Sequence, residues 1–216
     1  MTPQPKRHIT EEEYLEFDHS SALKHEYFNG AIYLMTGGTE SHNLLAGNAY
    51  ASLHGQLRRR PCRIYNSDQR IKVMTTGLHT YPDVTVVCGQ SLFTQRRRLT
   101  LVNPTMIIEV LSSSTERYDR GMKFQNYRLI PTLQDYILIS QDNYRIEQYI
   151  RQETGEWLLR EAVGVAAQVA ISSIDCVLSL EDVYEKVDFE LDDIGIQTET
   201  ASDDIEATTE KRKSNI

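Results

Sequence analysis

Two carboxylates in apolar surroundings are the residues of this sequence best suited to chemistry. Asp83 follows Pro82 and leads into the apolar run 84–88, and Glu109 interrupts the apolar run 106–111. A carboxylate in an apolar strand is costly unless it is paired or binds a metal ion. If the two strands are neighbours, both carboxylates meet at one edge of the sheet. Such a pair suits Mg²⁺, which prefers oxygen ligands and typically binds one or two protein carboxylates.

Groups that follow Glu109 could complete this site. The backbone carbonyl of Val110 could supply a third metal ligand. Asp119 and Lys123 are four residues apart, so they share one face of the helix expected there, and Tyr127 lies one turn further along. Lys123 could reach the metal edge, where it would help deprotonate an attacking water and neutralise charge on a phosphate.

Each of these residues also has a simpler structural interpretation. Asp83 could be a residue that starts a strand, and Glu109 could be a buried acid paired with an arginine. Lys123 could form an exposed ion pair with Asp119, which contributes little to stability. The residues together nevertheless favour the metal site.

Other polar residues are weaker candidates. Glu26, His42 and Asp68 are considered as supporting residues, although His42 is favoured as a helix residue without a chemical role. Two arginine clusters could bind a phosphate backbone if they flank the carboxylates, although most such clusters are merely solvated. They are Arg58-Arg59-Arg60 and Arg96-Arg97-Arg98.

Helix and strand signals alternate along the chain and predict an α/β fold. Capping patterns predict helices over 11–17 after Thr10, over 42–59 after Ser41, and over 115–129 after Ser113, and a short helix is expected over 180–185. Asn29-Gly30 predicts an N-terminal hairpin. Strands are predicted over 25–28, 31–35, 63–66, 69–74, 84–88, 106–111, 135–139, 145–150, 157–160 and 174–180.

Composition and charge indicate one globular domain with a tail. The chain has 216 residues, 40% of them hydrophobic, and a net charge of −8, of which −6 falls on residues 188–216. The nearly neutral body is compatible with nucleic-acid binding. We expect a disordered lead over 1–8, a domain over 9–187 and an acidic disordered tail over 188–216.

Cysteine usage and hydropathy predict a cytoplasmic protein without a membrane segment. Cys62, Cys88 and Cys176 form no CxxC motif, and the first two are expected to be buried free thiols. Free thiols suit a reducing cytosol. The sequence has no apolar run of transmembrane length.

The order and spacing of these residues carry a family resemblance. Pro82-Asp83, 25 further residues and Glu109-Val110-Leu111-Ser112 resemble the PD-(D/E)xK nuclease motif. The sequence as a whole resembles the Uma-two family of restriction-endonuclease-like proteins over about residues 9–187. The matching residues are 26–30 (EYFNG), His42, Ser67-Asp68, Pro82-Asp83, 109–115 (EVLSSST), Asp119, Lys123, Tyr127 and Asp135-Tyr136.

This resemblance implies a restriction-endonuclease-like core, with a central mixed sheet flanked by helices. It also implies a Mg²⁺ or Mn²⁺ site with Asp83 and Glu109 as ligands, DNA as the substrate, and a homodimer. The sequence departs from the motif at Leu111, where a lysine is usual, and Lys123 on the following helix takes the place of that lysine. The Ser-Pro-Ser-Thr usual after the strand is Ser-Ser-Ser-Thr here, at residues 112–115.

Three functions follow as hypotheses. The first is a metal-dependent endonuclease that hydrolyses DNA phosphodiester bonds with the help of Lys123. The second, suggested by Leu111, is a catalytically weak or inactive nuclease-fold module that binds nucleic acid or a protein. The third is an assembly scaffold in which the hairpin over 25–35 pairs across a dimer.

Overall fold

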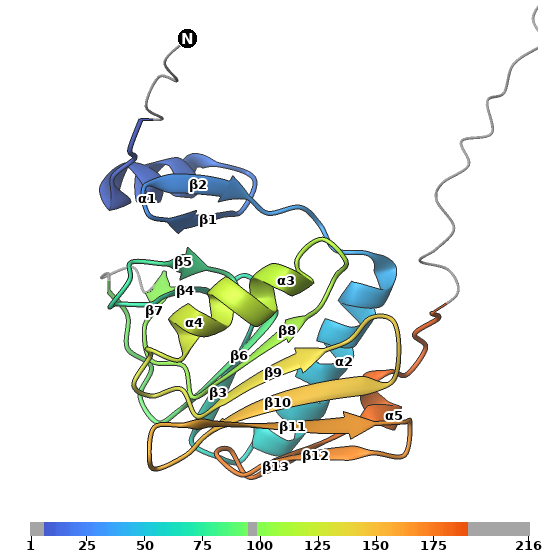
Figure 1. The fold of residues 1–216 in the computed structure, drawn as a ribbon. Helices are drawn as coiled ribbons and strands as arrows, with labels where there is room; N and C mark the ends of the chain where they lie inside the picture. Colours follow the sequence, from blue (N-terminus) through green and yellow to red (C-terminus); the bar gives the residue numbers. More distant parts are fainter. Residues whose placement is uncertain (1–6, 95–98, 190–216) are drawn as a thin grey trace, which may run out of the picture.

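The computed structural model describes residues 7–94 and 99–189, and its centre is a six-stranded mixed sheet (Figure 1). The strand order is β11-β10-β9-β8-β6-β3. Strands β8 and β9 are parallel, and all other neighbours are antiparallel. The strands are β3 (Cys62–Asn66), β6 (Val84–Cys88), β8 (Met106–Val110), β9 (Asp135–Ile139), β10 (Arg145–Arg151) and β11 (Trp157–Val163).

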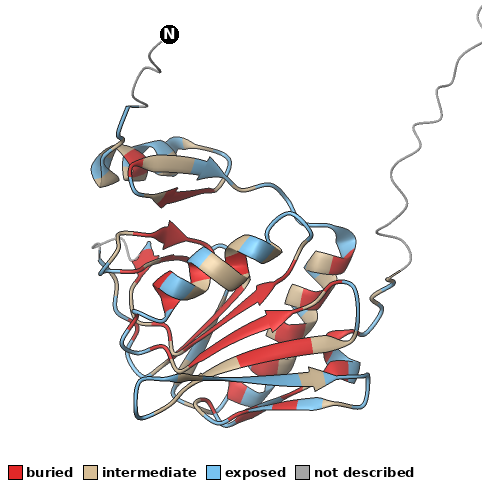
Figure 2. Ribbon diagram, viewed as in Figure 1, coloured by how far each residue is buried: buried red, intermediate tan, exposed pale blue. Residues whose placement is uncertain are grey.

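Helices cover both faces of this sheet, which buries its central strands (Figure 2). Helix α2 (Glu40–Leu57) lies on one face and buries leucines and an alanine spaced four residues apart. The hairpin of β12 (Gln168–Ile171) and β13 (Cys176–Ser179) packs on the same face, with α5 (Leu180–Val183). The other face carries the crossover from β8 to β9, which consists of α3 (Glu116–Tyr118), the π-helical turn η1 (Asp119–Lys123) and α4 (Phe124–Tyr127).

A second sheet lies at the N-terminal end and has the order β2-β1-β5-β4-β7. Its strands are β1 (His25–Phe28), β2 (Ala31–Leu34), β4 (Arg70–Lys72), β5 (His79–Thr80) and β7 (Thr100–Leu101). The predicted hairpin is confirmed, because Asn29 and Gly30 adopt φ values of 49° and 77° between β1 and β2. Helix α1 (Glu11–Ser20) begins with the predicted capping box of Thr10 and Glu13.

Several predicted element details are wrong. Helix α2 is capped by Thr39 rather than Ser41, because the Thr39 hydroxyl accepts the N–H of His42 at 3.2 Å. Ser113 does not cap the crossover helix; the hydroxyl of Ser112 accepts the N–H of Thr115 instead. That helix is also interrupted by the π-helical turn, and strand β12 was not predicted.

The prediction of free thiols at Cys62 and Cys88 is also wrong, because the two residues form a disulfide. They lie directly opposite each other on the antiparallel strands β3 and β6. This adjacency is hidden in the sequence, where they are 26 residues apart. Cys176 is a buried free thiol.

Two expectations concern regions that the structure describes only in part. The lead over 1–8 and the tail over 188–216 extend into residues 1–6 and 190–216, which lie outside the described residues, so these domain boundaries stay predictions. None of the helices in residues 7–94 and 99–189 has the length and apolar content needed to cross a membrane.

A buried ion pair attaches α1 to the second sheet and leads to a first prediction. Asp18 Oδ2 lies 2.6 Å from the guanidinium of Arg70, and both side chains are buried. Asp18→Asn leaves the charge of Arg70 uncompensated, so we expect it to lower the free energy of unfolding by about 3 kcal/mol. Urea titration measures this change. The exposed Asp175→Asn is the matched control, and equal stability of the two variants would contradict the prediction.

Candidate metal centre

Strands β6 and β8 place Asp83 and Glu109 side by side. The two strands pair antiparallel with Val84 opposite Ile108, so the next position of this register sets Asp83 opposite Glu109. Residues that face each other across an antiparallel pair point to the same side of the sheet. The predicted meeting of the two carboxylates at one sheet edge therefore matches the strand geometry.

Both oxygens of Asp83 have protein partners. The backbone N–H of Val110 donates to Oδ2 at 2.8 Å, and Nε2 of His42 lies 3.0 Å from Oδ1. Burial alone would lower the pKa of His42, but the hydrogen bond and charge of Asp83 raise it. His42, which the sequence favoured as a helix residue without a chemical role, thus contacts the central carboxylate of the candidate site.

Glu109 is buried, and one of its two carboxylate oxygens accepts hydrogen bonds from protein side chains. Oε1 accepts hydrogen bonds from Tyr127 Oη at 2.8 Å and Lys123 Nζ at 3.1 Å. Within residues 7–94 and 99–189, Oε2 has no protein donor. Burial raises the pKa of Glu109 to about 8, the charges of Asp119 and Asp83 add to this rise, and Lys123 opposes it.

Lys123 lies at the centre of three carboxylates. Nζ is 3.0 Å from Asp119 Oδ1, 3.1 Å from Glu109 Oε1 and 3.5 Å from Glu26 Oε1. Burial alone would lower the pKa of Lys123, but these acids raise it well above its ordinary value. The π-helical turn η1 carries both Asp119 and Lys123 and buries both. Such turns are often found at functional sites.

The N-terminal hairpin contributes Glu26 to this cluster. Thr80 on β5 donates to Glu26 Oε1, and Tyr118 on α3 donates to Oε2 at 2.9 Å. Sequence reasoning considered Glu26 but missed Thr80 and Tyr118. The sequence signal for Tyr118 is its position directly before Asp119. The chain has twelve tyrosines, so this position alone does not indicate a functional residue.

The donor set fits a hard divalent cation. Four carboxylates (Glu26, Asp83, Glu109, Asp119) surround one lysine and one histidine, so the cluster has an excess of acidic groups. In the described part of the chain, no three histidine, cysteine or acidic side chains converge closely enough to hold a metal ion. The fit therefore relies on the carboxylates of Asp83 and Glu109 together with water and substrate oxygens, as is usual for Mg²⁺.

Of the other candidate residues, Asp68 has a partner elsewhere, and Arg58 and Arg59 lie far from His42. Asp68 is exposed and pairs with Lys24 at 2.7 Å. Arg58 and Arg59 follow the last residue of α2, whereas His42 is in its first turn. At about 1.5 Å of rise per residue, Arg58 is roughly 24 Å from His42. The arginines at 96–98 lie outside the described residues.

Comparisons with known proteins agree with this architecture. The model of the Uma2 family, described as putative restriction endonuclease, matches residues 11–181. Two uncharacterized proteins of Synechocystis sp. are each 35% identical to the chain. One matches over 87% of this chain and 96% of its own length, the other over 76% and 93%.

A solved structure shares the fold. It is a putative nuclease of the DUF820 family from Anabaena variabilis, with a TM-score of 0.68 and 18% identity. The match covers 82% of this chain and 98% of that chain. The restriction-endonuclease-like fold predicted from the sequence is confirmed.

Proposed function

The chain belongs to the Uma2 family, and on this premise we propose that it is a metal-dependent nuclease that hydrolyses phosphodiester bonds of DNA. One observation carries the proposal. Glu109 is a buried acid in an otherwise apolar strand, and the register of β6 and β8 sets it beside Asp83. Two neighbouring carboxylates in apolar surroundings are costly unless cations compensate their charge, and a bound metal ion would do so.

Asp83, Glu109 and the backbone carbonyl of Val110 are the proposed ligands of Mg²⁺, with Mn²⁺ as the alternative ion. The bound ion would supply positive charge to the phosphate and to the attacking water. The N–H of Val110 and the imidazole of His42 orient the Asp83 carboxylate. Tyr127 and Lys123 orient that of Glu109.

Lys123 has a proposed role that differs from that of an exposed lysine. Its ammonium group is buried and held by acids from β1, β8 and η1. In such surroundings its charge acts over a longer range than in water. It therefore favours extra negative charge on a nearby phosphate, in addition to holding Glu109 in place.

Calorimetric titration with Mg²⁺ and Mn²⁺ tests the proposal. We expect the native chain to bind the ion and Asp83→Asn to lose binding, because one of two carboxylate ligands is removed. Asp68→Asn, at the exposed ion pair with Lys24, should bind as the native chain does. Titrations are repeated with DNA present, because substrate phosphate supplies ligands of its own. Unchanged binding by Asp83→Asn in both titrations would refute the site.

A second function, a nuclease-fold module that binds nucleic acid or a protein without cutting, has one observation in its favour. The carboxylates of Glu26, Glu109 and Asp119 are already engaged by Lys123, and Leu111 replaces the usual motif lysine. Cleavage that stops in chelator and returns with Mg²⁺ would exclude this function. DNA binding that persists in chelator, without cleavage, would support it. A homodimer and a cytoplasmic location stay further predictions.

A further inference from the structure

A shallow pocket lined in part by arginines lies beside the Cys62–Cys88 disulfide. Its volume is about 450 Å³. It opens beyond the C-terminal end of α2, at the end of β6 opposite to Asp83. The residues that line it are Arg60, Pro61, Cys62, Arg63, Gly89 and Gln90. Both cysteines of the disulfide are partly exposed.

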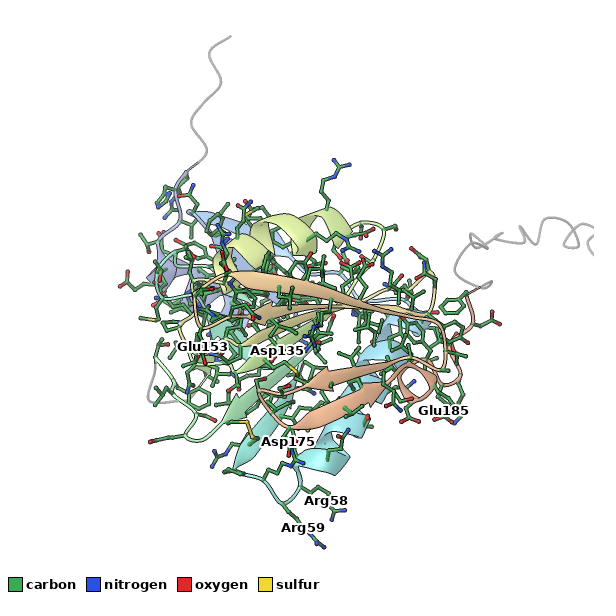
Figure 3. All side chains as sticks on the ribbon, turned by 60° about the horizontal axis from the view of Figure 1, so that its bottom comes forward. Arg58, Arg59, Asp135, Glu153, Asp175 and Glu185 are labelled. Atoms are coloured by element: carbon green, nitrogen blue, oxygen red, sulfur yellow. A yellow bond between two sulfur atoms is a disulfide. The ribbon has the colours of Figure 1, made fainter. Side chains whose placement is uncertain are left out.

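The charges around this pocket are mostly positive. Arg63 is exposed, and one of its amino groups donates to the carbonyl of Gly89 at 2.8 Å. Arg60 pairs with Asp175 at 3.1 Å, but the carboxylate of Asp175 is 92% exposed and therefore strongly screened by water. Arg58 and Arg59 project from the same end of the molecule (Figure 3). Neither forms an ion pair within residues 7–94 and 99–189.

We propose that Cys62 is a site of thiol–disulfide exchange selective for anionic low-molecular-weight thiols. Both cysteines are partly exposed, but only Cys62 lines the pocket beside Arg60 and Arg63, so its Sγ is the proposed point of attack. Arg60 and Arg63 attract a thiol that carries a carboxylate or sulfonate group. The same positive surroundings stabilise the thiolate of the reagent and the thiolate that leaves. The arginines at this end of α2 therefore recognise a small acidic thiol rather than the DNA backbone.

The exchange is balanced in atoms and electrons. A thiolate attacks Sγ of Cys62, the Cys62–Cys88 bond breaks, a mixed disulfide forms on Cys62, and Cys88 leaves as a thiolate that takes a proton from water. A second thiolate attacks the sulfur of the reagent and releases Cys62. Two reagent thiols are thereby oxidised to one disulfide, and the protein disulfide is reduced to two thiols.

The first experiment establishes the disulfide in the purified full chain. The protein is air-oxidised without reductant, denatured and alkylated, and then weighed by mass spectrometry. We expect one alkyl group, on Cys176, and three after prior reduction. Three groups without reduction would overturn the proposal at once.

The second experiment measures the charge selectivity. The rate at which the native protein is reduced is measured with an anionic, a neutral and a cationic thiol: mercaptoethanesulfonate, mercaptoethanol and cysteamine. The thiolate concentration is the same for all three. Each rate is divided by the rate at which the same thiol reduces a small-molecule disulfide. We expect the anionic thiol to react about tenfold faster than the neutral one, and the cationic thiol to be the slowest. Equal corrected rates for the three thiols would overturn the proposal.

Variants and salt then identify the source of the selectivity. The Arg60→Gln/Arg63→Gln variant should react with all three thiols at similar corrected rates. Arg7→Gln, at an exposed arginine that pairs with Glu13 of α1, should keep the native selectivity, because α1 lies at the opposite end of the molecule (Figure 1). In the native protein, roughly 0.5 M salt should remove most of the advantage of the anionic thiol, and this result does not depend on any variant folding. Selectivity that survives both the double substitution and salt would refute the role of the arginines.

Discussion

The Glu109→Gln variant is expected to lose phosphodiester cleavage and to gain stability relative to the native chain as the pH rises from 5 to 8. Glutamine keeps the size of the side chain and an oxygen that can accept the hydrogen bond of Tyr127. It removes the negative charge proposed to bind the metal ion. We expect the rate of cleavage to fall on the order of 10²–10³-fold, comparable to the loss when one preorganised electrostatic group is removed from an active site.

The gain in stability follows from the pKa of Glu109. Folding raises this pKa from 4.5 to about 8, so the folded state binds more protons than the unfolded state between these values. The contribution of Glu109 to stability is complete below about pH 4.5 and is lost as the pH rises through about 8. The amide has no such loss. The stability of Glu109→Gln relative to the native chain should therefore increase with pH by up to a few kcal/mol.

Urea unfolding at pH 5, 6.5 and 8 measures the difference, together with cleavage assays in Mg²⁺. Glu153→Gln, in the exposed turn between β10 and β11, is the control and should change neither property (Figure 3). If Glu109→Gln cleaves DNA at the native rate, the proposed ligand is wrong. If the stability difference between Glu109→Gln and the native chain shifts in favour of the native chain from pH 5 to pH 8, the electrostatic description of the cluster is wrong.

The Lys123→Met variant is expected to be the least stable of the single variants. Methionine retains most of the apolar stem but leaves Glu26, Glu109 and Asp119 without their shared cation. Removal of one partner from a buried charged group typically costs about 3–5 kcal/mol. The exposed Lys186→Met, measured by the same urea titration, is the control.

A second substitution separates the structural role of Lys123 from a chemical one. Lys123→Met combined with Asp119→Asn removes one cation and one of its acidic partners, so we expect it to regain at least about 1 kcal/mol. If Lys123 also assists hydrolysis, the double variant folds but stays inactive. Recovery of both stability and cleavage would show that Lys123 has only a structural role. Full native stability of Lys123→Met would contradict the cluster described above.

The sequence predicts the local parts of this site better than its long-range parts. The strands around Asp83 and Glu109 were predictable because each acid lies in or beside a short apolar run. The pairing of Asp119 with Lys123 was predictable from their spacing of four residues.

Other features depend on contacts that no local pattern encodes. The hydrogen bond from Tyr118 to Glu26 joins residues 92 positions apart. The disulfide depends on the register of β3 and β6, which spacing alone does not give. The distance of the Arg58–Arg59 pair from His42 depends on the length of α2, which separates them. A capping pattern predicted one regular crossover helix, whereas the structure has a π-helical turn over Asp119–Lys123.

The position of Lys123 has a consequence for how the protein matures. The lysine lies on the crossover that joins two parallel strands, β8 and β9, which cannot pair until that connection has folded over the sheet. Its partner Glu26 comes from a hairpin much earlier in the chain. A nascent chain therefore has to release both regions from the ribosome before the cluster can assemble. If the proposed function holds, fragments and half-folded intermediates, which lack the assembled cluster, are expected to be inert toward nucleic acid.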